Sequence, residues 1–366
     1  MKVAILFDQP HWTGLGEYAI LLHKLLCSSV EEVQLLYVGA IEDKHPSYTY
    51  KTYLKRTKRW FLRPITIRKN YKRIIEDKDY GDYLFHYLGY DPYPLKLKPG
   101  IFTIHDVIKE HLSDKINLIR DGKFKEALVS IERNRQVKQS IRMSSFASAV
   151  VTISDKTGSE LKHLSGITST TIYHWIANDR FQQRDKNKAL SYLKLDPKTK
   201  YILSVGNNRP NKRRDLIRNF SDCLPEGYKL IKIGAPVQSN KIINVGTVDS
   251  NYYPLYFNCS DAYLHLSEDE GFGRPLIEAL ASKIPIICRV NQINRELLDD
   301  TAIYINEKLT MDEALNVVSK LSDEGFLNEM QRKISRRCEF YKAEKALDKY
   351  LEIYEKKILN GTYSKL

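Results

Sequence analysis

The sequence predicts an α/β protein of two successive domains, each built around a parallel sheet. The chain has 366 residues, about two to three times the usual length of a single domain. Short apolar runs alternate with helical patterns, and the intervals between runs are too long for hairpins. A polar stretch interrupts this alternation before it restarts, which indicates βα units on both sides of a boundary.

The first predicted domain covers residues 1–181. Its opening apolar run is followed by a Leu-rich helical pattern from Gly16 to Leu26, as a βα unit requires. The ranges expected as its strands are 3–7, 33–38, 83–88, 101–105, 149–154 and 170–174.

A polar linker is expected at 182–200, followed by a second domain at 201–338. A helical pattern from about Glu339 to Leu359 dominates the closing segment, 339–366. The strands expected in the second domain are 201–206, 228–234, 241–246, 262–266, 284–288 and 302–305.

Composition excludes several classes of protein. A hydrophobic content of 42% supports two full cores and argues against disorder. No apolar stretch reaches the roughly 18 residues that a transmembrane helix needs, and the apolar start is too short for a signal peptide. The five cysteines are scattered without a C-x-x-C pair. We therefore expect a reducing cytoplasm, with neither a zinc ribbon nor a disulfide framework.

The net charge of +13 comes almost entirely from one segment. The range 51–73 holds ten basic residues and no acidic one, while the other 48 basic residues nearly balance 45 acidic ones. The excess therefore marks a local patch on the first domain and not a uniformly basic surface.

In parallel α/β domains ligands bind at the carboxyl ends of the strands. The segment 267–281, SEDEGFGRPLIEALA, follows an expected strand there. Its glycines permit a tight loop, and the helix starting near Arg274 presents free N–H groups to a polar ligand. Glu270 and Glu278 suit hydroxyl groups at the two ends of one extended ligand. Alternatively, Glu270 only caps the helix and Glu278 is solvated.

This segment resembles the signature of glycosyltransferase family 4, E-G-F-G-x-P-x-x-E-A-x-A followed by x-x-P-[IV]-[IV]. The resemblance implies the GT-B architecture, in which two Rossmann-like domains with parallel sheets face each other across a cleft. It also implies retaining transfer of a hexose from a nucleotide sugar. By this resemblance Glu270 and the amides of Phe272 and Gly273 hold the donor sugar, and Glu278 holds the nucleotide ribose. The closing helix would pack back onto the first domain.

Two positions depart from the family pattern. Arg274 stands where an apolar residue is usual, and Lys283 stands where glycine is usual. Neither change removes a functional group, but Arg274 could alter which sugar is accepted.

A second motif, 202–217, places cations at a helix start after an expected strand. Cations there can neutralise a diphosphate. Lys212 matches the family lysine that binds the donor phosphates. The family arginine falls on Asn211, so Arg209 is the candidate replacement. A solvated basic helix start is the alternative for these residues.

The loop after the first expected strand contains Gly14 and Gly16. The stretch G-L-G-E-Y-A matches the dinucleotide fingerprint, but five residues separate it from the strand, which weakens that match. It also resembles the family's glycine loop facing the donor phosphate, with Thr13 replacing one glycine. A purely conformational role for the glycines is the alternative.

His105 and Asp106 follow the expected strand 101–105. A lone histidine is usually a packed or surface residue, but similar enzymes carry a His–Asp pair here near the sugar and acceptor. The resemblance therefore places His105 in the active site and Asp106 on the acceptor side. Tyr90, which follows the preceding strand, is a further candidate for the acceptor side.

No metal site is expected. Asp77 and Asp79 spell D-x-D in a polar loop that follows no apolar strand, which favours a solvated loop. Binding of a UDP- or GDP-linked donor should therefore depend on cations and helix dipoles, with no cofactor and no obligatory metal.

The basic segment has aromatic residues at its margins, as an interfacial helix on an anionic leaflet requires. We expect peripheral association with the inner face of the cell membrane, by analogy with enzymes that act on lipid-linked acceptors. Nucleic-acid binding and a merely solvated helix are the alternatives. The residues expected in the patch are Arg56, Arg59, Trp60, Lys69 and Arg73.

The sequence thus predicts a retaining hexosyltransferase acting on a glycan or lipid-linked acceptor. Two other classes remain as alternatives. A dinucleotide-dependent oxidoreductase needs glycines directly after the first strand and an acidic residue ending the second, which this chain lacks. A nucleic-acid-binding protein would use the basic patch.

Overall fold

Two units make up the chain, and the first is discontinuous in sequence. It comprises Met1–Tyr173 and Ala343–Leu366, whereas the second comprises His174–Lys342. Within the described ranges, no helix has both the length and the apolar character needed to cross a bilayer. The computed structural model describes residues 1–41, 43–44, 51–52, 63–90, 93–107, 119–120, 122, 124–177, 180–306 and 310–359.

The first unit contains a seven-stranded parallel sheet in the order β3-β2-β1-β4-β5-β6-β7. Its register sets Ile5 of β1 opposite Leu35 of β2 and His86 of β4. The central strands are buried along their whole length, which explains their continuous apolar sequences. The strands are β1 (Lys2–Phe7), β2 (Glu32–Tyr37), β3 (Lys51–Thr52), β4 (Leu84–Tyr87), β5 (Ile101–Ile104), β6 (Ala149–Thr152) and β7 (Thr170–Thr171).

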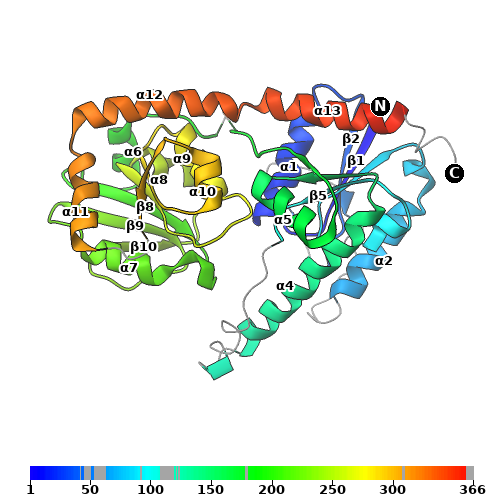
Figure 1. Cartoon of the computed structure of the whole chain (residues 1–366), viewed down its shortest axis with the longest axis horizontal. Coiled ribbons are helices and arrows are strands. Elements are labelled where there is room, and N and C mark those ends of the chain that lie inside the picture. The colour runs from blue at the N-terminus through cyan, green and yellow to red at the C-terminus, as the bar shows by residue number, and fades with distance from the viewer. Residues whose placement is uncertain are drawn as a thin grey trace. The chain divides into compact units, whose positions relative to one another are not determined.

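Helices surround this sheet (Figure 1). One cluster of buried side chains joins strands β1, β4 and β5 to two of the helices, α2 and α4. The helices are α1 (Gly14–Leu26), α2 (Arg63–Ile75), α4 (Phe124–Met143), α5 (Asp155–Ser165) and α13 (Ala343–Leu359), with 3-10 turns η2 (Lys78–Tyr80), η3 (Tyr93–Lys96) and η4 (Ser144–Phe146).

The second unit contains a six-stranded parallel sheet in the order β10-β9-β8-β11-β12-β13, the strand order of a dinucleotide-binding fold. The strands are β8 (Lys200–Gly206), β9 (Tyr228–Gly234), β10 (Ile242–Gly246), β11 (Ala262–His265), β12 (Ile286–Arg289) and β13 (Ala302–Ile305). The helices are α6 (Lys186–Tyr192), η5 (Pro210–Lys212), α7 (Arg214–Asp222), α8 (Tyr253–Asn258), α9 (Arg274–Ala281), α10 (Gln292–Leu298), α11 (Met311–Lys320) and α12 (Glu324–Phe340).

The predicted class of two parallel α/β units is confirmed, whereas some boundaries differ. The expected linker at 182–200 contains α6 and belongs to the second unit. The closing helical pattern is divided between α12 and α13, with a break at 341–342. The short strand β3, which pairs with β2, carried too few apolar residues to be recognised.

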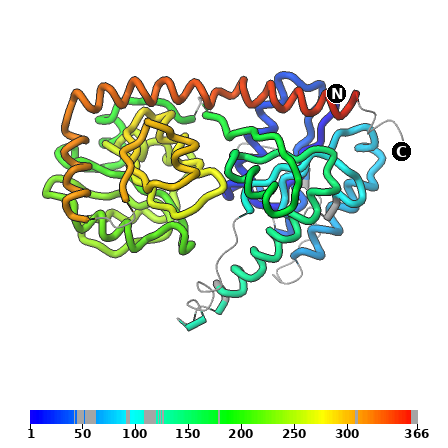
Figure 2. The backbone as a smooth tube through the Cα atoms, in the orientation of Figure 1, coloured from blue at the N-terminus to red at the C-terminus, as the bar shows by residue number. Residues whose placement is uncertain are grey.

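The helix α13 packs beside α1, so the two ends of the first unit meet (Figure 2). Tyr350 of α13 hydrogen-bonds Tyr18 of α1 through their buried hydroxyl groups. The hydroxyl of Tyr354 lies 2.7 Å from His86 Nδ1, and that of Thr103 lies 2.7 Å from His86 Nε2. Since a neutral imidazole has one donor and one acceptor, both ring nitrogens are satisfied. Burial, assisted by His105, lowers the pKa of His86 to about 3, which keeps the ring neutral.

We expect Tyr354→Phe to destabilise the first unit by about 1–3 kcal/mol, because it leaves a buried imidazole nitrogen without its partner. Urea unfolding measures this loss. Tyr192→Phe, at an exposed tyrosine of the second unit, is the control and should change little. Equal unfolding free energies for Tyr354→Phe and the wild type would contradict this account of α13.

Candidate functional site

The carboxyl ends of neighbouring strands β8 and β11 bring together two of the predicted site residues. Lys212, in the loop after β8, places its Nζ 2.5 Å from Oε1 of Glu270, in the loop after β11. Both side chains are more than four-fifths buried. Glu270 therefore does not cap α9, because its carboxylate pairs with a cation on another loop.

The pair is surrounded by buried groups that set its charge. Burial alone raises the pKa of Glu270, but Lys212 and His265 outweigh it and hold the value at about 2. Nε2 of His265 lies 3.4 Å from Oε1 of Glu270, and the Tyr263 hydroxyl lies 3.2 Å from Nδ1 of the same ring. Burial lowers the pKa of His265 to about 4, with Glu270 raising it and Lys212 lowering it. Glu270 is therefore ionised beside a neutral imidazole at neutral pH.

Asn211 ties the same two loops together. Its side-chain NH₂ group donates to the backbone carbonyl of Asp269 at 2.8 Å. The backbone carbonyl of Asn211 accepts from the backbone N–H of Glu268 at 2.7 Å. The position where the family has arginine therefore has a structural role in this chain.

The cations around Lys212 differ in their surroundings. Arg209 is exposed at the start of η5, and Arg213 pairs with Asp215 at 2.8 Å. Lys232 of β9 is buried, and its Nζ donates to the carbonyls of Gly206 and Ile233. Burial, followed by Lys212 and Arg214, lowers the pKa of Lys232 to about 8. Lys232 adds positive potential near the ends of β8 and β9. The sequence does not indicate this role, because a lysine inside a strand belongs to no motif.

The helix α9 positions the second glutamate. Gly273 precedes it with φ +93°, a left-handed conformation, and a Cβ there would lie 3.1 Å from Leu276 Cδ1. Glu278 is 7% exposed, so it is not a solvated helix residue. Its Oε2 accepts a hydrogen bond of 2.9 Å from the Tyr253 hydroxyl, and Arg274 lies 3.6 Å from its Oε1. Arg274 therefore places a positive charge beside the carboxylate of Glu278.

Phe272 is buried and its ring packs on the ring of His174 with centroids 4.6 Å apart. Tyr341 packs edge-on against the same ring. The packing of Phe272 thus helps to fix the loop between β11 and α9. The backbone amides of Phe272 and Gly273, which the resemblance assigns to sugar binding, belong to this loop.

The first unit gathers polar groups at the carboxyl ends of β1, β4 and β5. Asp8 accepts from the backbone N–H of Tyr90 at 3.0 Å, and Asp106 pairs with Arg133 of α4 at 3.0 Å. Burial, with Asp106 and Asp8, raises the pKa of Tyr90, whereas Arg133 opposes them. The ring of His105 lies edge-on to Tyr18 with centroids 4.9 Å apart. The sequence assigned no role to Asp8, which opens the glycine-containing loop, or to Arg133, which lies on a helix without a motif.

The two glycines of the first loop have different roles. A Cβ at Gly16 would lie 2.1 Å from the Pro10 carbonyl oxygen, so this position requires glycine for close packing. A Cβ at Gly14 would meet nothing within 4 Å. Steric need therefore explains Gly16 but not Gly14, which begins α1 directly after the N-cap Thr13.

The predicted basic patch is described only in part. Arg56, Arg59 and Trp60 lie outside the described residues. Lys69 and Arg73 lie on the exposed side of α2, whereas the apolar face of this helix packs into the core. An apolar stripe on α2 is therefore not available to a membrane.

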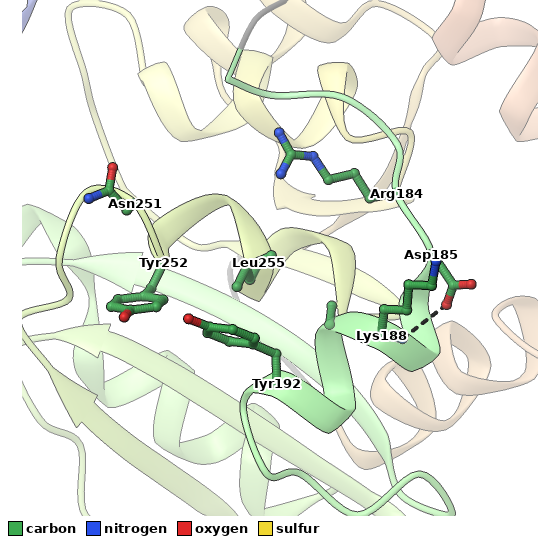
Figure 3. A pocket seen from close by; sticks show the side chains of 8 residues that line it. Arg184, Asp185, Lys188, Tyr192, Asn251, Tyr252 and Leu255 are labelled. Atoms are coloured by element: carbon green, nitrogen blue, oxygen red, sulfur yellow. Dashed lines mark hydrogen bonds between the residues drawn. The ribbon is translucent and has the colours of Figure 1, made fainter.

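A cavity of about 440 Å³ in the second unit lies apart from these residues, between α6 and α8 (Figure 3). Tyr192 and Tyr252, two of its lining residues, have ring centroids 5.5 Å apart. None of the residues predicted to bind the donor lines it.

The D-x-D sequence contributes to a turn. Asp77 caps η2 by accepting a hydrogen bond from the backbone N–H of Asp79. In the described part of the chain, no group of three acidic, histidine or cysteine side chains is arranged to hold a metal ion.

Comparison with known proteins identifies the second unit. Residues 185–338 match the family model described as glycosyl transferases group 1. This segment is similar to the group 1 glycosyltransferases. It contains Lys212, Glu270 and Glu278. The match favours a glycosyltransferase over an oxidoreductase or a nucleic-acid-binding protein.

Relatives of known activity extend the comparison. The chain is 21% identical to O-antigen chain mannosyltransferase B of Escherichia coli over 359 residues, covering 86% of this chain and 88% of that protein. It is 26% identical to O-antigen chain mannosyltransferase RfbU of Salmonella typhimurium over 148 residues, covering 36% of this chain. This second match spans 42% of the relative's length.

The fold is that of GT-B glycosyltransferases. The structure of the Anabaena protein HepE in complex with UDP-glucose matches with a TM-score of 0.72 and 14% identity, covering 97% of this chain and all of that chain. The predicted GT-B architecture is therefore confirmed.

Replacing Lys212 by Met should raise the pKa of Glu270, because the carboxylate loses its cation but stays buried. In the wild type, the lowered pKa contributes stability that is present above pH 4.5 and lost as the pH falls toward 2. We expect the variant to be about 3 kcal/mol less stable at neutral pH. This difference should shrink below pH 4.5, as measured by urea unfolding across a pH series. Lys229→Met removes an exposed lysine as the control, and a pH-independent loss in Lys212→Met would contradict the pairing.

Proposed function

We propose that the protein transfers a hexose, with retention of configuration, from a nucleoside-diphosphate sugar to a glycan or lipid-linked acceptor. The observation that carries the proposal is the buried Lys212–Glu270 pair at the carboxyl ends of β8 and β11. The ammonium group suits the anionic diphosphate, and the adjacent carboxylate can accept hydrogen bonds from the hydroxyl groups of the sugar. The family match of the second unit and the mannosyltransferase relatives support it.

Each predicted residue has a place in this reaction. Lys212, assisted by Arg209 and the positive potential of Lys232, would neutralise the charge that develops on the leaving diphosphate. Glu270 and the amides of Phe272 and Gly273 would hold the hydroxyls of the donor sugar. Glu278 would accept hydrogen bonds from the ribose hydroxyls.

The leaving phosphate would help to deprotonate the attacking hydroxyl on the same face of the sugar, because no residue stands out as a covalent nucleophile. Gly14 of the glycine loop would face the donor phosphate, with Gly16 keeping that loop close to Pro10. On the acceptor side, His105, Asp106 and Tyr90 would contact the incoming glycan. The cations of the second unit would make an obligatory metal unnecessary.

Donor binding tests the first part. A nucleoside diphosphate that binds the native state raises the Tm by mass action. GDP, GDP-mannose, UDP and UDP-glucose should be compared, and we expect the GDP pair to stabilise most because both relatives are mannosyltransferases. Lys212→Met should lose most of this stabilisation, whereas Lys229→Met should keep it. A wild-type Tm unchanged by all four compounds would overturn the proposal.

Catalysis tests the second part. With the donor found by thermal stabilisation, Glu270→Gln and Lys212→Met should each lower kcat by about 100-fold or more. The product should keep the donor's anomeric configuration by NMR, and EDTA should not stop the reaction. Full activity in both variants, or an inverted product, would contradict the assigned chemistry.

Peripheral association with an anionic membrane completes the proposal. On α2 the exposed side is basic, with Lys69, Lys72 and Arg73. On α4 large apolar side chains are exposed to solvent at the amino-terminal end, including Phe124 at 63% and Val129 at 62%. Both helices contact η3. A basic helix face and exposed apolar residues in the same unit are two features of a surface that is attracted to an anionic bilayer and inserts into it.

Vesicle sedimentation tests this association. Replacing Arg56, Arg59, Lys69 and Arg73 by Gln should reduce binding to anionic vesicles, since each basic residue near the surface contributes up to about 1 kcal/mol. Phe124→Ser with Val129→Ser should weaken binding at any salt concentration. Lys198→Gln with Lys229→Gln, which removes two exposed positive charges from the second unit, is the control. Unchanged sedimentation in both test variants would refute the membrane proposal.

A further inference from the structure

Trp12 is exposed in the loop that follows β1. Its side chain is 63% exposed, although a large aromatic ring gains free energy when water is removed from its faces. The function proposed above does not use it.

The loop around Trp12 is nevertheless held firmly. On one side, the backbone N–H of His11 donates to Oδ2 of the buried Asp43 at 2.9 Å, and its ring bonds the other carboxylate oxygen. On the other side, the Thr13 hydroxyl donates to the Pro10 carbonyl at 2.7 Å and accepts from the Gly16 N–H. The His11 and Trp12 rings also meet edge-on, with centroids 5.0 Å apart. The hydrogen bonds on both sides of Trp12 therefore hold the loop in a conformation that exposes the ring.

The position of the loop indicates what the ring meets. It follows the carboxyl end of β1, which lies between β2 and β4 in the sheet. The polar groups Asp8 and Tyr90 lie at the ends of β1 and β4, and Asp106 follows the next strand, β5. Carboxylates accept hydrogen bonds from sugar hydroxyls, while an aromatic face covers the C–H groups of a pyranose ring.

The immediate neighbours of Trp12 argue against a lipid contact. Gln9, His11 and Thr13 are polar, so Trp12 is a single aromatic residue in a polar loop. Insertion into a bilayer needs a cluster of exposed apolar side chains, like those at the start of α4.

We propose that Trp12 is the stacking platform for a pyranose ring of the acceptor glycan. Asp8, Tyr90 and Asp106 provide hydrogen bonds at the same edge of the sheet. This inference rests on the proposed hexosyl transfer and names the acceptor as a saccharide. Because the ring is fixed before the ligand arrives, little side-chain entropy is lost on binding.

The kinetic test compares Trp12→Ala, Trp12→Phe and Phe146→Ala. Phe146 is an exposed aromatic residue that precedes β6, at the amino edge of the same sheet. With short manno-oligosaccharides as acceptors, Trp12→Ala should raise the acceptor KM by about three- to tenfold and leave the donor KM unchanged. Trp12→Phe should retain part of the affinity, and Phe146→Ala should match the wild type. An unchanged acceptor KM in Trp12→Ala would overturn the proposal.

A binding test needs no catalysis. Short manno- and gluco-oligosaccharides should protect tryptophan fluorescence from acrylamide quenching in the wild type and not in Trp12→Phe. Protection without any hexosyl transfer would leave the platform standing and remove the proposed function. Hexosyl transfer without any protection of the fluorescence would keep the proposed function and refute the role of Trp12 as a stacking platform. Loss of vesicle binding in Trp12→Ala, with saccharide protection absent, would assign the ring to lipid and refute the proposal.

Discussion

A carboxylate that stays ionised in a buried site needs a compensating cation or hydrogen bonds, and in the second unit Lys212 supplies the cation for Glu270. The two residues are 58 positions apart and meet only because β8 and β11 are neighbours in a parallel sheet. Asn211 adds uncharged hydrogen bonds between the same loops. The left-handed Gly273 then turns the chain into α9, which carries Glu278. The geometry assigned to donor binding thus follows from one ion pair.

The first unit also places charged side chains after its strands, with a different balance of acidic and basic groups. Its strand ends carry Asp8, Asp43 and Asp106, whereas those of the second unit carry Lys212 and Lys232. Carboxylates suit a ligand rich in hydroxyl groups, and ammonium groups suit a diphosphate. The two lysines of the second unit, with Glu270 beside Lys212, therefore suit a sugar diphosphate, whereas the carboxylates of the first unit suit a saccharide.

The sequence was sufficient to predict the parallel sheets and the residues within motifs, because apolar runs and glycine-containing loops are local signals. It could not predict contacts between distant segments. Arg133 lies on a helix with no motif and is recognised only through Asp106, and Lys232 only through its burial. Only the structure shows that the apolar face of α2, with Tyr71 and Ile74, packs into the protein core. Trp12 lies two residues before Gly14 in the glycine-containing loop, but the exposure of its ring cannot be read from the sequence.

The partners of His86 have a consequence for biosynthesis. Its two hydroxyl partners are Thr103, from the first third of the chain, and Tyr354, from the last described helix. The second unit is one continuous segment, so all of its strands and helices leave the ribosome before α13 does. The first unit therefore cannot complete its fold before the second unit has been translated. Until α13 has been translated, Nδ1 of His86 lacks its Tyr354 partner and the first unit exposes the surface that α13 covers.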